Sequence, residues 1–313
     1  MRASTTALFL GLTSLTLVGC DFAATGVKGN FSFQYTPYTW HSFNTPLAVG
    51  AKADVTVSFD DGGGLVKDVS CSTSDSSVVS VTVRGGGLLT LEGRKAGIVE
   101  ITCAGGDLDD AISVEARDVA SVEISPPDKD SLGVTDPYVV AQGGRAQYSF
   151  TLYDSTSRTL MGYDLDGFTA DSGATVAWTH SLDYVEVTYA ELGVTEVDHP
   201  LAVQPASVQV VDPATVVTLA WTALVPTEMT VGAAIIGVPD ARDGNNQSVL
   251  GLHGLMVVTS KTPAVCSITE GSWGVFLNAY VISGLAAGTC TLGLELGDVS
   301  AEHTLEVVEE AQQ

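Results

Sequence analysis

The sequence predicts an all-β protein built from several antiparallel sandwiches. Only 16% of its 313 residues are charged and 33 are glycine. Short runs of alternating apolar and polar residues recur, separated by Gly, Asp, Asn and Pro, which is typical of antiparallel sandwiches. One sandwich of this length would be unusually large, so we expect tandem modules. The clearest predicted strands are 53–59, 78–83, 98–103, 146–152, 289–294 and 304–308.

The N-terminal segment predicts a signal peptide over residues 1–19. It holds one basic residue, Arg2, an apolar stretch from Ala7 to Val18 and no acidic residue, and it is too short to serve as a permanent membrane span. Its ending, Leu17-Val18-Gly19-Cys20, resembles the lipobox of bacterial lipoproteins, in which the cysteine is acylated and becomes the mature N-terminus. The alternative is an ordinary cleaved signal peptide with a chance cysteine.

The lipobox resemblance implies a location and an anchor. Fatty acyl chains such as palmitate would hold the chain to a membrane through Cys20, with residues 20–29 as a lipidated tether. We therefore expect a cell-envelope protein, on the outer membrane and cell surface or on the periplasmic side of a membrane. The sequence does not choose between these locations.

The charge of the chain excludes one class of partner. It has 13 Lys and Arg against 37 Asp and Glu, a formal net charge of −24. Such a surface repels nucleic acid, so we expect no nucleic-acid partner. High acidity is also compatible with cation binding, although a solvated acidic surface is its more frequent meaning.

Internal repeats divide the chain into modules. The runs Ala120–Ile124 and Ala206–Val210 resemble each other, and each predicts the first strand of a module. A second repeat links the first and last modules through two Val-Gly pairs and two glycine-rich turns: Val49-Gly50 and Val231-Gly232, with Leu91–Gly97 and Ile282–Gly288. The predicted modules are 30–117, 118–204, which is divergent, and 205–313.

This order of features resembles the bacterial immunoglobulin-like domains of group 2, found in intimin-type and invasin-type adhesins and in many surface lipoproteins. The resemblance covers about residues 45–117 and 228–309. Of these features, the middle module shows only the predicted first strand and, at residues 140–144, a sequence similar to the Val-Gly pair. The resemblance implies immunoglobulin-like β-sandwich modules with a spacer or adhesive role and no catalysis.

Four cysteines remain after Cys20, and in an exported chain they should form two disulfides. Three pairings exist. Only Cys71 with Cys103 and Cys266 with Cys290 keeps both bonds inside a module. Each bond would contribute on the order of 3 kcal/mol by chain entropy. Neither pair has Cys-x-x-Cys spacing, so their predicted role is structural.

The sequence contains no catalytic motif. It has no His-Glu-x-x-His and no Gly-x-Ser-x-Gly, and its five histidines are dispersed at positions 41, 180, 199, 253 and 303. A pair of carboxylates at glycosidase separation stays open, because the chain has many of them. We therefore expect a protein that is not an enzyme and needs no cofactor.

Two weaker candidate sites concern calcium. One loop around Gly244 offers oxygen ligands from Asp240, Asp243, Asn245 and Asn246, but the same residues also suit a plain turn. Asp107, Asp109 and Asp110 raise the same alternatives.

Aromatic residues suggest a second kind of ligand. Trp273 is predicted to be exposed in a loop, where it could stack on a sugar or a protein, whereas Trp178 and Trp221 are predicted core residues. A further aromatic run fits either a buried first strand or a sugar-stacking face. Its members are Phe31, Phe33, Tyr35, Tyr38 and Trp40.

The sequence as a whole predicts a non-catalytic, lipid-anchored envelope protein that acts as a structural spacer or an adhesive, protein-binding array. Three modules end to end would form a rod of about 100–120 Å. The alternative function is a carbohydrate- or calcium-binding module set within an envelope complex. The protein or glycan partner is not identified by the sequence.

Overall fold

The fold was determined from a computed structural model of the chain. The structure describes residues 23–36, 42–125, 138–171, 173–178, 184–222, 225–273 and 276–309. These residues form 28 strands and one 3-10 turn, η1 (Pro213–Thr215), with no α-helix. The predicted all-β class of tandem sandwiches is therefore confirmed, and all six clearly predicted strands are present.

The first module is a sandwich of two sheets. One sheet has the strand order β1-β2-β4-β7-β6, and the other has the order β3-β9-β8-β5. The strands of the first sheet are β1 (Ala24–Thr25), β2 (Phe31–Thr36), β4 (Lys52–Phe59), β7 (Leu88–Gly93) and β6 (Val79–Gly85). Those of the second are β3 (Leu47–Ala48), β9 (Leu108–Arg117), β8 (Gly97–Gly105) and β5 (Ser70–Thr73).

Alternation along β2 builds the core of this module. Phe31, Phe33 and Tyr35 are each at most 1% exposed, while the residues between them are half-buried. Burial of one such ring stabilises the fold by about 1.5–3 kcal/mol. The aromatic run is therefore a buried strand, at least as far as Tyr35, and Tyr38 and Trp40 lie outside the described residues.

The second module also has two sheets. One is β10-β12-β16-β15, with β13 paired to β12, and the other is β14-β17-β18-β11-β23. The strands of the first sheet are β10 (Ser121–Ser125), β12 (Arg145–Tyr153), β13 (Thr159–Leu160), β15 (Thr175–Trp178) and β16 (Tyr184–Thr188). Those of the second are β11 (Val139–Ala141), β14 (Thr169–Ala170), β17 (Gly193–Asp198) and β18 (Ala206–Val211), joined at the edge by β23 (Val249–Leu250), which belongs to the chain of the third module.

Strand β18 corrects one prediction. Its sequence repeat with Ala120–Ile124 predicted the first strand of the third module, but β18 pairs antiparallel with β17 and parallel with β11. Its inward residues Val208 and Val210 join the core of the second module. By its pairing, Ala206–Val211 is the last strand of the second module, so the expected boundary at residue 205 falls after residue 211.

The third module has three smaller sheets: β19-β22, β20-β28-β27-β24 and β21-β26-β25. Its earlier strands are β19 (Val216–Trp221), β20 (Glu228–Thr230), β21 (Ala234–Gly237), β22 (Pro239–Asp243) and β24 (Val257–Ser260). Its later strands are β25 (Cys266–Trp273), β26 (Phe276–Gly284), β27 (Gly288–Leu296) and β28 (Val299–Val308).

The three modules share one structural feature, a short strand paired in parallel. Each holds a short strand that pairs in parallel with its last strand: β3 with β9, β11 with β18, and β20 with β28. A glycine with positive φ follows each short strand, Gly50, Gly143 or Gly232. Gly50 N–H donates to the Gly93 carbonyl at 2.8 Å, and Gly232 N–H donates to the Gly284 carbonyl at 2.9 Å. The Val-Gly repeats therefore mark equivalent points in the fold.

Both disulfides lie within modules. Cys71 in β5 faces Cys103 in the neighbouring strand β8, with 4.1 Å between their Cα atoms. Cys266 in β25 and Cys290 in β27 join two different sheets, with 5.7 Å between Cα atoms. This is the pairing that the sequence argument favoured, and it places Cys103, Cys266 and Cys290 in the core.

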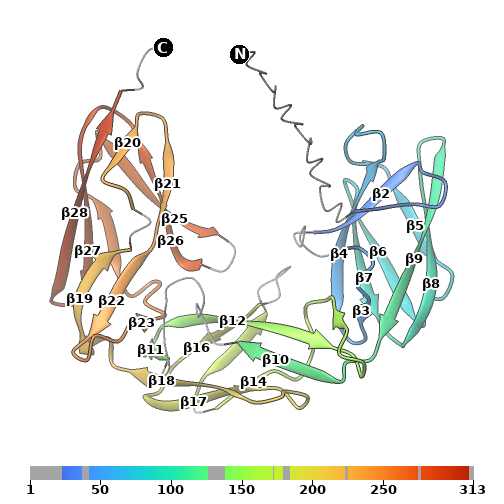
Figure 1. The fold of residues 1–313 in the computed structure, drawn as a ribbon, viewed down its shortest axis with the longest axis horizontal. Helices are drawn as coiled ribbons and strands as arrows, with labels where there is room; N and C mark the ends of the chain where they lie inside the picture. The colour runs from blue at the N-terminus through green and yellow to red at the C-terminus, as the bar shows by residue number, and fades with distance from the viewer. Residues whose placement is uncertain are drawn as a thin grey trace, which may run out of the picture.

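The modules do not form the straight rod expected from the sequence. Figure 1 shows the first and third modules rising from the two ends of the second module on the same side, so that the chain is curved. Only residues 118–120 separate β9 of the first module from β10 of the second, so these two modules lie directly against each other. The curvature of the chain arises where one module meets the next, at the two junctions described below.

Candidate functional site: the two junctions between modules

The predicted lipidation site, Cys20, lies outside the described part of the chain, as do two of the five dispersed histidines, His41 and His180. Trp273 ends β25, so the structure places its backbone in a strand rather than a loop, and its side chain lies outside the described residues. Acylation at Cys20 and stacking on Trp273 therefore stay predictions.

The candidate calcium loop has the hydrogen bonding of a turn. The Asp243 Oδ1 atom accepts the backbone N–H groups of Asn245 and Gln247 at 2.9 and 2.8 Å. The carboxylate of Asp240 instead accepts Arg242 Nε at 2.8 Å and Ser248 Oγ at 3.2 Å. The two carboxylates thus face different protein donors. Calcium binding by Asp240, Asp243 and Asn245 stays the untested alternative to a plain turn.

Asp110 has a structural role at the start of the first module. Its carboxylate is fully buried and accepts four backbone N–H groups, from Lys28, Asn30, Phe31 and Ala111, at 2.7–3.0 Å. Burial favours the protonated acid, but these four donors outweigh it and hold the pKa of Asp110 below its ordinary value.

This clamp shortens the expected tether. Ala24 and Thr25 form β1, which pairs with β2, and residues 28–31 are held by Asp110. Gly26 lies so close to the Asp110 carboxylate that an added Cβ would overlap it. Part of the segment 20–29 therefore belongs to the first module.

At the first junction, between the first and second modules, backbone hydrogen bonds cross directly from one module to the other. Met161 donates to the Pro46 carbonyl at 2.7 Å, and Ala48 donates to the Met161 carbonyl at 2.8 Å. Lys52 and Tyr163 exchange a further pair at 2.8 and 2.7 Å. The segment after β13 thus extends the strand pairing of the first module.

Side chains at the first junction are buried together. Met161 and Tyr163 pack in the core of the first module, and Ala48 and Ala51 pack in the core of the second. Gly162 fits here because an added Cβ would lie 2.6 Å from the Cβ of Ala51. The two cores therefore interlock across the junction.

One buried hydrogen bond completes this contact. Tyr163, 4% exposed, donates its hydroxyl to Asp54 Oδ1 at 2.9 Å, and Thr90 donates to the same oxygen at 2.7 Å. Burial, and then the hydrogen bond to Asp54, raises the pKa of Tyr163 to about 12. The phenol therefore stays protonated and can donate across the working pH range.

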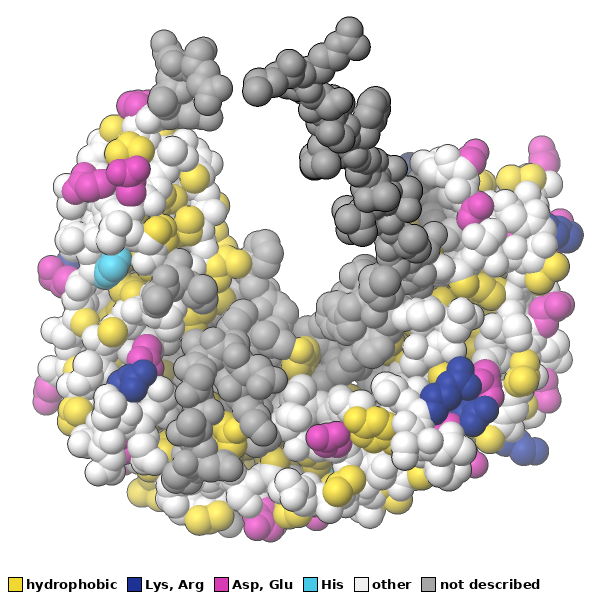
Figure 2. Space-filling view, viewed as in Figure 1, with side chains coloured by type: hydrophobic (Ala, Val, Ile, Leu, Met, Phe, Trp, Pro, Cys, Tyr) yellow, Lys and Arg dark blue, Asp and Glu magenta, His cyan; other side chains and the backbone are white. Residues whose placement is uncertain are grey.

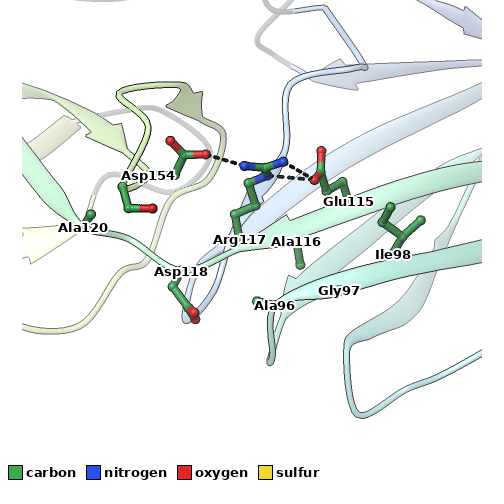
Figure 3. Close-up of a pocket in the computed structure, with 10 residues that line it drawn as sticks. Ala96, Gly97, Ile98, Glu115, Ala116, Arg117, Asp118, Ala120 and Asp154 are labelled. Atoms are coloured by element: carbon green, nitrogen blue, oxygen red, sulfur yellow. Dashed lines mark hydrogen bonds and ion pairs between the residues drawn. The ribbon is translucent and has the colours of Figure 1, made fainter.

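A pocket of about 450 Å³ opens beside the first junction (Figure 3). Arg117 points from β9 toward two carboxylates and pairs with Glu115 at 2.7 Å and with Asp154 of the second module at 2.8 Å. These bonds, led by that to Glu115, hold the pKa of Arg117 above its ordinary value. Arg158 also pairs with Glu115 at 2.9 Å. These ion pairs join residues of the first module to residues of the second.

The second junction, between the second and third modules, is built on sheet continuity. Strand β23 pairs in parallel with β11, with Val139 opposite Val249 and Val140 opposite Leu250. The Arg145 N–H donates to the Gly251 carbonyl at 3.2 Å. One core cluster contains residues of both modules: Val139, Ala141, Val216, Leu219, Ala241, Val249, Leu252, Met256, Leu294 and Leu296.

Charged side chains flank this second junction. The Arg145 guanidinium contacts His253 Nδ1 at 2.6 Å and Glu186 at 3.3 Å. The opposite nitrogen of His253, Nε2, contacts Glu270 of β25. His253 therefore lies between a cation of the second module and an anion of the third.

The described residues contain no group of three or more His, Cys, Asp or Glu side chains placed to hold a metal ion. Three histidines lie in the described residues. His199 and His253 contact separate backbone and side-chain partners, and the buried Nε2 atom of His303, in β28, has no hydrogen-bond partner within the described part of the chain. Figure 2 shows acidic side chains scattered over the visible face, with the few basic ones bordered by acidic neighbours.

Among the described residues, no helix has the length and apolar character needed to cross a membrane.

Comparison with known proteins does not assign the chain to a family. No family model matches the sequence, and no curated protein matches it. Solved structures similar to the chain include domains 4–9 of the surface-layer protein SbsC (16% identity, 92% of this chain and 46% of that one, TM-score 0.30). The Escherichia coli adhesin FdeC is similar at 19% identity over 91% of this chain and 99% of that one, with a TM-score of 0.27.

An enzyme is similar at a comparable level. The endo-fucoidan hydrolase MfFcnA4 has 14% identity over 87% of this chain and 44% of that one, with a TM-score of 0.25. The chain thus spans less than half of SbsC domains 4–9 and of this hydrolase. Because all three scores are low, these likenesses carry no argument about activity or partners.

Sequence reasoning missed the residues that make the junctions. Tyr163, Asp54, Arg145 and His253 carry no motif, because they meet only when two modules pack. One glycine in the sequence did point to a junction. Gly144 lies so close to the Gly251 carbonyl that an added Cβ would overlap it, so the glycine-containing segment 140–144 lies at the second junction.

Proposed function

We propose that the chain is a non-catalytic envelope protein that serves as a curved spacer or adhesion array of fixed shape. The observation that carries this proposal is the pair of junctions, where backbone hydrogen bonds and shared cores join each module to the next. Flexible linkers would let the modules reorient, whereas interlocked cores present them in one orientation.

The proposed anchor is an acyl group on Cys20, and the proposed location is the cell envelope. The sequence motif at 17–20 supports both. With an acyl group on Cys20, β1 and the clamp on residues 28–31 would leave only a short stretch between the lipid and the first module. The first module would then stand close to the membrane surface and hold the other two at a set angle to it.

The proposed partner is a second macromolecule, a protein or a glycan, that binds to the surface of the three modules. The acidic surface supports a partner other than nucleic acid.

Two experiments test the proposed function. Mass spectrometry of the protein from its host should find diacyl or triacyl mass on Cys20, and Cys20→Ser should release the chain from the membrane fraction. A membrane-bound Cys20→Ser variant without acyl mass would contradict the anchor. Protease treatment of intact cells should cleave the chain if it acts in adhesion, and full protection would contradict an adhesive role.

A further inference from the structure

The Arg145 contact fixes the protonation of His253. A guanidinium only donates hydrogen bonds, so His253 Nδ1, 2.6 Å from Arg145 Nη2, must be an unprotonated acceptor. The ring proton therefore sits on Nε2, where it donates to the Glu270 carboxylate. This geometry holds only for the neutral imidazole.

The two contacts of His253 lead to different modules. Arg145 lies in β12 of the second module and also pairs with Glu186 of β16 at 3.3 Å. Glu270 lies in β25 of the third module, opposite Tyr280 of β26. The His253 side chain is 16% exposed, and Glu186 is 18% exposed. The junction thus contains one neutral acceptor between a cation and an anion.

We propose that His253 makes the second junction sensitive to pH, so that acidification loosens the third module from the second. Protonation puts a hydrogen on Nδ1, removes the acceptor for Arg145 and places two cations side by side. The same protonation strengthens the bond to Glu270, so His253 stays with the third module. Arg145 keeps its pair with Glu186 in the second module. The link between the modules is what opens.

The remaining contacts limit the extent of opening. The backbone pairing of β11 with β23 and the hydrogen bond from the backbone N–H of Arg145 to the Gly251 carbonyl involve no titratable group. These backbone bonds stay in place in acid, so acidification makes the junction open more often without unfolding either module. The inference goes beyond the proposed function, because it concerns the angle between modules whatever they bind.

Hydrogen exchange of the full chain tests this directly. We expect the protection of residues 139–146 and 249–256, corrected for intrinsic rates, to fall about tenfold when the chain is acidified from about pH 7.5 to about pH 5.5. A tenfold change is what the loss of one charged hydrogen bond gives. Strands β27 and β28 should keep their protection.

Two variants separate the mechanism from a general acid effect. In His253→Gln the side-chain amide accepts from Arg145 and donates to Glu270 at every pH, so the protection of the junction should not change with pH. In Arg145→Gln the repelling charge is absent, and the pH effect should also disappear. An unchanged wild-type junction, or an equal loss in the wild type and both variants, would overturn the proposal.

Discussion

Replacing Tyr163 by Phe tests the first junction with the loss of one oxygen atom. The substitution removes the 2.9 Å hydrogen bond to Asp54 and leaves the ring, its burial and the neighbouring backbone bonds in place. Asp54 is 6% exposed and keeps Thr90 as a donor. Loss of a hydrogen bond to a buried carboxylate costs about 2 kcal/mol. For two joined modules this lowers the thermal midpoint by about 4–8 °C.

Differential scanning calorimetry measures this change, and Tyr153→Phe is the matched control. Tyr153 also belongs to the second module and donates to Glu123 at 3.1 Å, but this bond is exposed, so its loss should cost well under about 1 kcal/mol. Equal midpoints for Tyr163→Phe and the unmodified chain would refute the account of the first junction.

Three further predictions concern other parts of the chain. Asp110→Asn should destabilise the first module by about 2–4 kcal/mol at neutral pH, because an amide cannot accept from four N–H groups. Since the folded pKa of Asp110 is lowered, its contribution is present above about pH 4 and is lost as pH falls further. The difference between variant and wild type, measured by urea unfolding, should therefore shrink in acid, and a constant difference would contradict the clamp. Gly144→Ala should disrupt the second junction by collision with the Gly251 carbonyl, whereas Gly244→Ala, with open space around it, should leave the thermal midpoint unchanged. Millimolar calcium should not raise the midpoint, because Asp243 already accepts N–H groups of its own turn; a clear rise would instead support the cation-binding alternative.

Strands and disulfides could be predicted from the sequence because they depend on local patterns. Alternation of period two places Phe31, Phe33 and Tyr35 on one face of β2 wherever the module lies. The pairing of Cys266 with Cys290 follows from chain distance alone. Such features are properties of one module and are visible within a short window of sequence.

The junctions could not be predicted in the same way. The similar runs at 120–124 and 206–210 both read as first strands, but a strand's position in a sandwich depends on its partners, and β18 pairs with β17 and β11. The bond from Tyr163 to Asp54 joins residues 109 positions apart. No periodicity connects such residues, so the curvature that they fix was missed.

Small-angle X-ray scattering of the chain in solution near neutral pH tests the central claim most directly, because it measures the arrangement of the three modules. Interlocked junctions predict a profile that fits the single curved arrangement of Figure 1. They also predict a maximum dimension below the roughly 100–120 Å of three modules in line. A profile that needs a straight rod, or a broad ensemble of inter-module angles, would contradict junctions of fixed shape.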